Sequence, residues 1–224
     1  MGDNSPADMK ELQFRFIGSI IAGFTHELKN HLAIIKESGG LQQDLLSMSK
    51  KPDSAELNRF LRSVDSQVSR SLQLIAFLNR FAHRMDCQCS SFSVNDVVEE
   101  LVALMARVAY QKRIEISKEF EQDILPVHNN PSMLHLLIFS IIEEMMDRFE
   151  KGGSITVRTS SAKNTIRIAI IPKGNMKEPS GKGDDHRVEV INKVCRELFA
   201  SVDQQGANGE AVVILTRSIE AASK

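Results

Sequence analysis

The sequence has no excess of charge of either sign and few cysteines. Its 28 basic and 29 acidic residues leave a formal net charge of −1, so no basic surplus attracts nucleic acid, and we expect a protein partner instead. The three cysteines, Cys87, Cys89 and Cys195, are too few and too unevenly spaced for a disulfide framework, and Cys87 and Cys89 lack the second ligand pair of a zinc site. We therefore expect reduced thiols in the cytoplasm.

Long apolar runs are missing as well. No stretch approaches the roughly 20 apolar residues that cross a membrane, and residues 1–13 contain no run that resembles a signal sequence. We therefore expect a soluble cytoplasmic protein without membrane contact. With 224 residues and 42% hydrophobic content, the chain is long enough to bury a core, and we favour two small domains over one large domain.

Proline is absent between Pro6 and Pro52, an interval in which apolar residues recur in steps of four and three. The seam that they form consists of Ile17, Ile21, Phe24, Leu28 and Ile35, with His31 in the remaining position. This heptad spacing predicts a long amphipathic helix. Gly39 and Gly40 interrupt the pattern, and we expect a kink or a close packing contact there, because each glycine costs a helix roughly 1 kcal/mol relative to alanine.

A second long helix is predicted to begin after Asp53, which forms a capping box with Glu56. The seam of this helix comprises Leu57, Leu61, Val64, Val68, Ser71, Ile75, Leu78, Ala82 and Met85. Two such helices joined by a short turn form an antiparallel hairpin whose wide apolar faces need a partner. We expect a homodimer in which two hairpins make a four-helix bundle. The alternative is a hairpin that packs on the chain's own second domain.

The second half of the chain mixes helical and strand patterns. Ser93 with Asp96 gives a capping signal for a first helix. Helices are expected over 97–112, 134–149 and 186–202, and strands over 113–120, within 124–134, and over 153–161, 165–172 and 210–218. The sequence therefore predicts an α+β protein: a helical hairpin over residues 8–88, and an α/β sandwich with helices on one face of a mixed sheet over residues 92–221.

His26 does not belong to the hydrophobic seam of the first helix. At about 100° per residue it lies roughly 160° from both Phe24 and Leu28, so it is expected to face outward, with Asn30 on the same face and Glu27 beside it. A neutral imidazole nitrogen is nucleophilic near pH 7, and a neighbouring carboxylate can hold its tautomer or take a proton. His31, by contrast, is expected to be a packed or hydrogen-bonded residue of the bundle.

The stretch "FTHELKNHLAII", residues 24–35, resembles the phosphoacceptor motif of two-component sensor histidine kinases. It departs from that motif at His31, where the family usually has proline. The resemblance implies that His26 accepts a phosphoryl group, that Glu27 orients it or relieves it of a proton, and that Asn30 positions water. Because the hairpin places residues 76–80 level with His26, a partner-binding surface is expected to include Lys29, Ala76, Phe77 and Arg80, while Phe81 is an alternative core residue.

The resemblance continues through residues 10–220, because the order of elements in the second half is similar to the ATP-binding domain of the same superfamily. The nucleotide-binding residues do not carry over. Ser140 and Glu144 stand where the family has two asparagines, the second of which holds Mg²⁺. Pro172 replaces the aspartate that reads adenine, and Met176 replaces a glycine.

The expected lid region retains Gly181-Lys182-Gly183, but Asp184 and Asp185 follow and repel a triphosphate. We therefore expect no cofactor in this chain: ATP binding is not predicted, and Mg²⁺ is expected to come from the partner's receiver domain.

Three functions remain open at this point. The first is a histidine phosphotransferase that moves a phosphoryl group between His26 and the aspartates of response regulator receiver domains, with a hybrid histidine kinase as a further candidate partner. The second is an ATP-dependent histidine kinase with an atypical pocket, which Glu144 and the intact phosphoacceptor motif favour. The third is a pseudo-kinase that binds receivers or acts as a response-regulator phosphatase without relaying a phosphoryl group.

Overall fold

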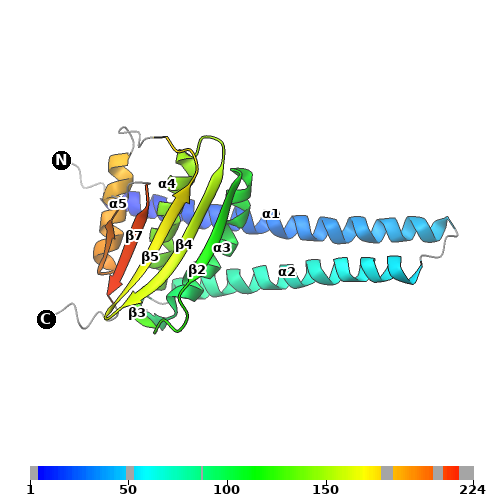
Figure 1. The fold of residues 1–224 in the computed structure, drawn as a ribbon, viewed down its shortest axis with the longest axis horizontal. Coiled ribbons are helices and arrows are strands. Elements are labelled where there is room, and N and C mark those ends of the chain that lie inside the picture. The colour runs from blue at the N-terminus through cyan, green and yellow to red at the C-terminus, as the bar shows by residue number, and fades with distance from the viewer. Residues whose placement is uncertain (1–4, 49–52, 87, 178–183, 204–208, 217–224) are drawn as a thin grey trace.

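The computed structural model describes residues 5–48, 53–86, 88–177, 184–203 and 209–216. Helices α1 (Ser5–Ser47) and α2 (Ser54–Asp86) run antiparallel and side by side, and their far ends project beyond the rest of the molecule (Figure 1). The predicted hairpin is confirmed. The start of α2 is capped as expected, since the backbone N–H of Glu56 donates to Asp53 Oδ1 at 2.6 Å and thereby satisfies one of the free N–H groups of the first turn.

Helix α1 continues without interruption through Gly39 and Gly40. A Cβ atom at either position would meet no heavy atom within 4 Å outside the local helix backbone. Among the described residues, none makes a close packing contact with these glycines, so that expectation is wrong.

The second half alternates helices and strands. Its elements are β1 (Ser90–Phe92), α3 (Val94–Gln111), β2 (Ile114–Phe120), β3 (Val127–Asn129), α4 (Pro131–Arg148), β4 (Gly153–Ala162), β5 (Thr165–Lys173), α5 (Asp184–Glu197), β6 (Ala200–Asp203) and β7 (Ala211–Thr216). Side-chain oxygens cap two of the helices. Ser93 Oγ accepts from the N–H of Asp96 at the start of α3, and Asn130 Oδ1 accepts from the N–H groups of Ser132 and Met133 at the start of α4.

Five of the strands form a mixed sheet in the order β2-β4-β5-β7-β6. Strands β2 and β4 are parallel, and the other neighbours are antiparallel. Helices α3, α4 and α5 lie on one face of this sheet (Figure 1). Strands β4 and β5 bury alternate residues against these helices, as the period of two along a strand requires. The predicted α+β fold with a mixed sheet is confirmed.

Two short strands, β1 and β6, do not follow from the sequence pattern. Strand β1 pairs with β3 in a separate two-stranded sheet, although its three residues are too few to show a period. Strand β6 occupies positions that were expected to continue the last helix to residue 202, so this part of the prediction is wrong. Helix α5 ends at Glu197 because Phe199 adopts a positive φ of 49°, which reverses the chain into β6. A phenylalanine in that conformation provides no sequence signal, since glycine or asparagine is the usual residue there.

The hydrophobic core runs from the base of the hairpin into the second half. The ring of Phe16 in α1 lies 5.3 Å from that of Phe81 in α2 and 4.8 Å from that of Phe139 in α4, centroid to centroid. All three are buried, together with Leu101 and Leu104 of α3. The base of the hairpin therefore packs on the chain's own second half, which was the alternative arrangement considered from the sequence. The expected division at residues 88–92 includes β1, and the core continues across it.

Among the described residues, no helix combines the length and the apolar composition that a membrane crossing requires.

Candidate functional site

His26 is exposed on α1, as its position relative to the seam predicts. Its ring nonetheless has a partner from the second half of the chain, because Arg107 Nη2 in α3 lies 3.2 Å from His26 Nε2. A guanidinium group only donates hydrogen bonds, so Nε2 accepts here and the ring proton is on Nδ1. This is the neutral tautomer in which Nε2 is unprotonated and its electron pair accepts the hydrogen bond from Arg107. No sequence signal pointed to Arg107, which lies 81 positions away on another helix.

A glycine permits α3 to approach α1 next to this histidine. Gly23 is buried, and a Cβ atom on it would lie 3.2 Å from the backbone oxygen of Leu104. That separation is tighter than most Cβ contacts in proteins. Because Gly23 is three residues before His26, the contact brings α3 alongside the turn of α1 that carries the imidazole.

His31 is buried in the interface between α1 and α2, as expected for a seam residue. Ser71 Oγ donates its one hydrogen to the backbone oxygen of Gln67 at 2.8 Å, so it accepts from His31 Nδ1 at 3.2 Å. The other ring nitrogen, Nε2, lies 3.6 Å from Glu27 Oε1. The second histidine of the motif is therefore a hydrogen-bonded residue of the hairpin, in agreement with the prediction.

Glu27 and Asn30 lie beside each other on α1. Asn30 Nδ2 donates to Glu27 Oε2 at 3.5 Å, while the other carboxylate oxygen faces His31. The Glu27 carboxylate is thus directed along the helix toward these two residues. Its expected action on His26, and the expected water-positioning role of Asn30, stay predictions.

A cleft of about 570 Å³ opens next to His26, between α1, α2 and α3. Polar side chains form much of its wall, namely Glu27, Asn30, Gln67, Arg70, Arg107 and Tyr110. Two buried polar atoms of these side chains have no hydrogen-bond partner among the described residues: Gln67 Oε1 and Arg107 Nε. Buried polar groups are usually paired. These two atoms could therefore form hydrogen bonds with a small polar ligand in the cleft.

The structure places two of the predicted partner-binding residues in an internal interface. Phe77 is 7% exposed, with the guanidinium of Arg80 4.9 Å from its ring centre, and Arg80 Nε donates to Glu100 Oε1 at 2.9 Å. Phe77 is therefore not on a free flank in this arrangement, whereas the side chain of Arg80 is paired with α3 but stays 51% exposed. Lys29 is exposed and Ala76 is half-buried. A role for these four residues in partner binding stays a prediction.

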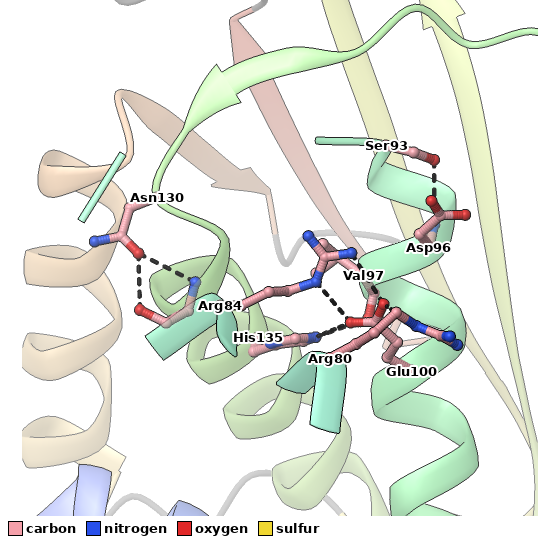
Figure 2. Close-up of polar contacts among 9 residues, drawn as sticks. Arg80, Arg84, Ser93, Asp96, Val97, Glu100, Asn130 and His135 are labelled. Atoms are coloured by element: carbon pink, nitrogen blue, oxygen red, sulfur yellow. Dashed lines mark hydrogen bonds and ion pairs between the residues drawn. The ribbon is translucent and has the colours of Figure 1, made fainter. Parts of the chain in front are cut away.

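The interface between the hairpin and α3 is organised around one buried carboxylate, shown in Figure 2. Glu100 is fully buried. Arg84 Nε and Nη2 donate to its two oxygens at 2.6 Å and 2.9 Å, and Arg80 donates as well. A buried charge needs such partners, because transfer out of water costs several kcal/mol. Glu100 was not among the residues predicted to matter, although its position on the apolar face of α3, three residues after Val97, is a sequence signal for a buried ion pair.

His135 in α4 completes this cluster (Figure 2). It is fully buried, its Nε2 lies 3.0 Å from the backbone oxygen of Val97, and the same nitrogen is 3.8 Å from Glu100 Oε2. Burial, with a further contribution from the charge of Arg84, lowers the pKa of His135 to about 3. The ring is therefore neutral and donates its Nε2 proton to Val97. The cluster joins α2, α3 and α4, and it fixes the base of the hairpin against the second half.

The positions that correspond to the nucleotide-binding residues of the ATP-binding domain differ in exposure: Ser140 and Pro172 are buried, Glu144 and Met176 are half-buried, and Gly174 is exposed. Ser140 is 1% exposed, and its hydroxyl donates to the backbone oxygen of Leu136 at 2.8 Å. After β5, a Cβ atom on Gly174 would lie 2.8 Å from the ring of Phe149, and Phe149 forms an isolated bridge with Met176. The expected absence of ATP binding stays a prediction. The Gly181-Lys182-Gly183 segment and the side chains of Asp184 and Asp185 lie outside the described residues.

No protein-family model matches the chain. Among curated proteins, it is similar to the signal transduction histidine-protein kinase AtoS of Escherichia coli (strain K12), with 25% identity over 144 residues that cover 64% of this chain and 22% of AtoS. Sporulation kinase C of Bacillus subtilis (strain 168) is 23% identical over 157 residues, which cover 70% of this chain and 35% of that kinase. The chain thus spans less than half of the length of either relative.

Solved structures share the fold. The catalytic domain of histidine kinase ThkA matches with a TM-score of 0.51 and 12% identity, covering 60% of this chain and 99% of that domain. Histidine kinase ThkA in complex with response regulator protein TrrA matches with a TM-score of 0.50 and 13% identity, covering 95% of this chain and 65% of that chain. The curated relatives are thus histidine kinases, and the chain shares the fold of a histidine kinase, so it resembles the superfamily of two-component histidine kinases.

Proposed function

We propose that this protein is a histidine phosphotransferase, which moves a phosphoryl group between His26 and an aspartate of a response regulator receiver domain. The observation that carries the proposal is the state of His26. Its imidazole is exposed on the hairpin, and Nε2 is the unprotonated ring nitrogen because it accepts a hydrogen bond from Arg107. A nucleophilic nitrogen at the surface can reach a phosphoryl group that a second protein presents.

The packed residues of the second half support a donor other than ATP. The hydroxyl of Ser140 is hydrogen-bonded inside its own helix, and the ring of Phe149 fills the space beside Gly174. Pro172 is paired in the sheet opposite Ile155, and its side chain has no acceptor for an adenine amino group. In this proposal the second half is a scaffold that holds the hairpin, and it takes no part in nucleotide chemistry.

Catalysis by such a protein consists largely of positioning. The receiver domain contributes its own Mg²⁺ and acidic pocket, so this chain has to present one nitrogen in line with the phosphorus–oxygen bond that breaks. The lone pair of Nε2 forms the new bond to phosphorus, and the aspartate carboxylate leaves with the electron pair of the broken bond. Nδ1 keeps its proton throughout.

The exposed apolar residues of the hairpin support a homodimer. Several large side chains on the projecting part are at least two-fifths exposed: Leu41, Leu46, Leu57, Leu61 and Val68. A hairpin of this kind buries such a surface when a second copy packs against it around a twofold axis. We therefore retain the four-helix bundle as the proposed assembly.

A receiver domain is the proposed partner. Histidine kinase ThkA, whose fold this chain shares, has been solved in complex with a response regulator protein. The exposed flank of α1 that carries His26 and Lys29 is the surface that a receiver has to reach.

Two alternative functions were open from the sequence. ATP-dependent kinase activity is favoured by the relatives, which are kinases. A receiver-binding phosphatase needs the same surface but no nucleophilic His26.

The test of the proposal is transfer of labelled phosphate from a panel of phosphorylated receiver domains to the purified protein. We expect an acid-labile, base-stable label on the wild-type chain and none on His26→Ala. The matched control is His83→Ala, which removes another exposed histidine of the hairpin and should leave the transfer unchanged. If His26→Ala still binds a receiver and accelerates its dephosphorylation while the wild type takes up no label, the phosphatase alternative replaces the phosphotransferase.

A further inference from the structure

Arg107 reaches the nitrogen that is proposed to carry the phosphoryl group. Its Nη2 donates to His26 Nε2 at 3.2 Å, although the two residues belong to different halves of the chain. A phosphoryl group bonded to Nε2 has its oxygens within a few ångströms of that nitrogen. The guanidinium is therefore already beside the position that those oxygens would occupy.

The arginine also has hydrogen-bonding capacity to spare. Its Nε is buried and has no acceptor among the described residues, and Nη2 makes one weak contact with a neutral ring nitrogen. A phosphoryl group brings several oxygen acceptors and negative charge, which a planar guanidinium binds through parallel hydrogen bonds. Transfer of a phosphoryl group to His26 would thus supply the acceptors that the resting structure lacks.

The surroundings hold Arg107 in place. Its guanidinium lies 5.5 Å from the centre of the Tyr110 ring, and the close approach of Leu104 to Gly23 fixes α3 against α1. The cleft beside it is also lined by Arg70, a second cation, and by the carboxylates of Glu27 and Glu37. One oxygen of Glu27 accepts from Asn30 and the other faces His31, so this carboxylate is directed to other partners.

We propose that Arg107 is a catalytic residue of the phosphotransfer. This inference rests on the proposed function and adds the second half of the chain to the reaction. In the resting protein Arg107 donates to the electron pair of His26 Nε2 and keeps the proton on Nδ1. As Nε2 forms its bond to phosphorus and the donor's phosphorus–oxygen bond breaks, the guanidinium moves from the nitrogen to the phosphoryl oxygens. The carboxylate of the donor leaves with the electron pair, and the ring becomes a cation that retains its Nδ1 proton.

A small-molecule phosphoryl donor tests this role without any receiver domain. The purified full chain is incubated with potassium phosphoramidate, and phosphohistidine formation is followed by ³¹P NMR. The phosphorus–nitrogen bond of phosphoramidate breaks and ammonia leaves as Nε2 bonds to phosphorus. We expect Arg107→Gln to lower the rate constant at least about ten-fold, as the loss of a charge-assisted hydrogen bond does. Arg107→Lys should retain an intermediate rate because it keeps the charge, and His26→Ala should lack the phosphohistidine signal of His26.

The matched control is Arg113→Gln, which removes an exposed arginine just beyond the end of the same helix and should react at the wild-type rate. Thermal unfolding followed by circular dichroism verifies that each variant is folded. If Arg107→Gln were unfolded, Arg107→Lys alone decides. A rate for Arg107→Lys between those of the wild type and His26→Ala supports the inference, and a wild-type rate for Arg107→Lys overturns it.

The possible results separate this inference from the proposed function. Equal rates for Arg107→Gln and the wild type overturn the inference, and a faster reaction also overturns it, because Arg107 would then only block Nε2. If no receiver domain transfers its phosphate but phosphoramidate modifies His26 in an Arg107-dependent way, the inference stands for the chemistry of the site and the proposed relay function fails.

Discussion

Gly23 of α1 lies against the backbone oxygen of Leu104 in α3, so close that a Cβ atom on Gly23 would be 3.2 Å from that oxygen. This contact holds the second half of the chain beside the proposed phosphoacceptor histidine, although the two residues are far apart in sequence. We expect Gly23→Val to push α3 away and to lower the free energy of unfolding by about 1–3 kcal/mol, the usual cost of overpacking. Urea unfolding measures this loss.

The control for that variant is Gly18→Val on the same helix. A Cβ atom at Gly18 would meet nothing within 4 Å, so this substitution should leave the stability within about 0.5 kcal/mol of the wild type, as is usual for surface changes. Equal losses for the two variants would contradict the close contact with α3.

The two arginines that bind Glu100 should contribute unequally to stability. The side chain of Arg84 is 17% exposed and contacts both carboxylate oxygens, whereas that of Arg80 is 51% exposed and contacts one. Arg84→Ala leaves a buried carboxylate short of its main partner, and we expect a loss of about 3–5 kcal/mol. Arg80→Ala should cost about 1 kcal/mol or less, since water screens an exposed ion pair. Chemical denaturation of the two variants decides this, and a larger loss for Arg80→Ala would refute the ranking.

His135 should make the protein less stable in acid. Its pKa is about 3 in the folded chain and about 6.5 in the unfolded chain. Between these values the unfolded state binds a proton that the folded state does not, so stability is complete above pH 6.5 and is lost as the pH falls toward 3. We expect His135→Gln to reduce the slope of unfolding free energy against pH by up to about 1.4 kcal/mol per unit between pH 4.5 and 6. An unchanged slope would mean that the buried ring takes up a proton without unfolding.

The proposed dimer depends on the exposed leucines of the projecting hairpin. Leu61 is 53% exposed on α2, and a charge there should oppose burial between two copies. We expect Leu61→Glu to convert the dimer to a monomer in analytical ultracentrifugation. Leu125→Glu, which alters a similarly exposed leucine between β2 and β3 (58%), should remain dimeric. A wild-type chain that sediments as a monomer would rule out the four-helix bundle.

The periodic parts of the structure could be predicted from the sequence, and the contacts between distant segments could not. Steps of four and three identified α1 and α2 as a hairpin, and they separated the exposed His26 from the buried His31. Strand β6 was missed because the positive φ of Phe199, which ends the preceding helix, has no sequence signal. Arg107 was missed for a different reason: local periodicity describes one helix at a time, and only packing shows that α3 lies against α1.

Alternative partners for one apolar face are equally hard to rank from a sequence. The hairpin seam predicted a partner surface, but it did not show that Phe77 would be buried or that Arg80 would bind Glu100 of α3. Glu100 was the one residue that could have indicated this, because a carboxylate on the apolar face of a helix needs a cation from a neighbouring element.

The central claim is that His26 receives its phosphoryl group from a receiver domain and that ATP is not the donor. The most direct measurement compares γ-labelled ATP with labelled receiver domains in parallel reactions on the wild-type chain and His26→Ala. The account predicts label on His26 from a receiver and none from ATP. Label on His26 from ATP alone would contradict it, and would identify the protein as a histidine kinase whose pocket accommodates Ser140, Phe149 and Pro172.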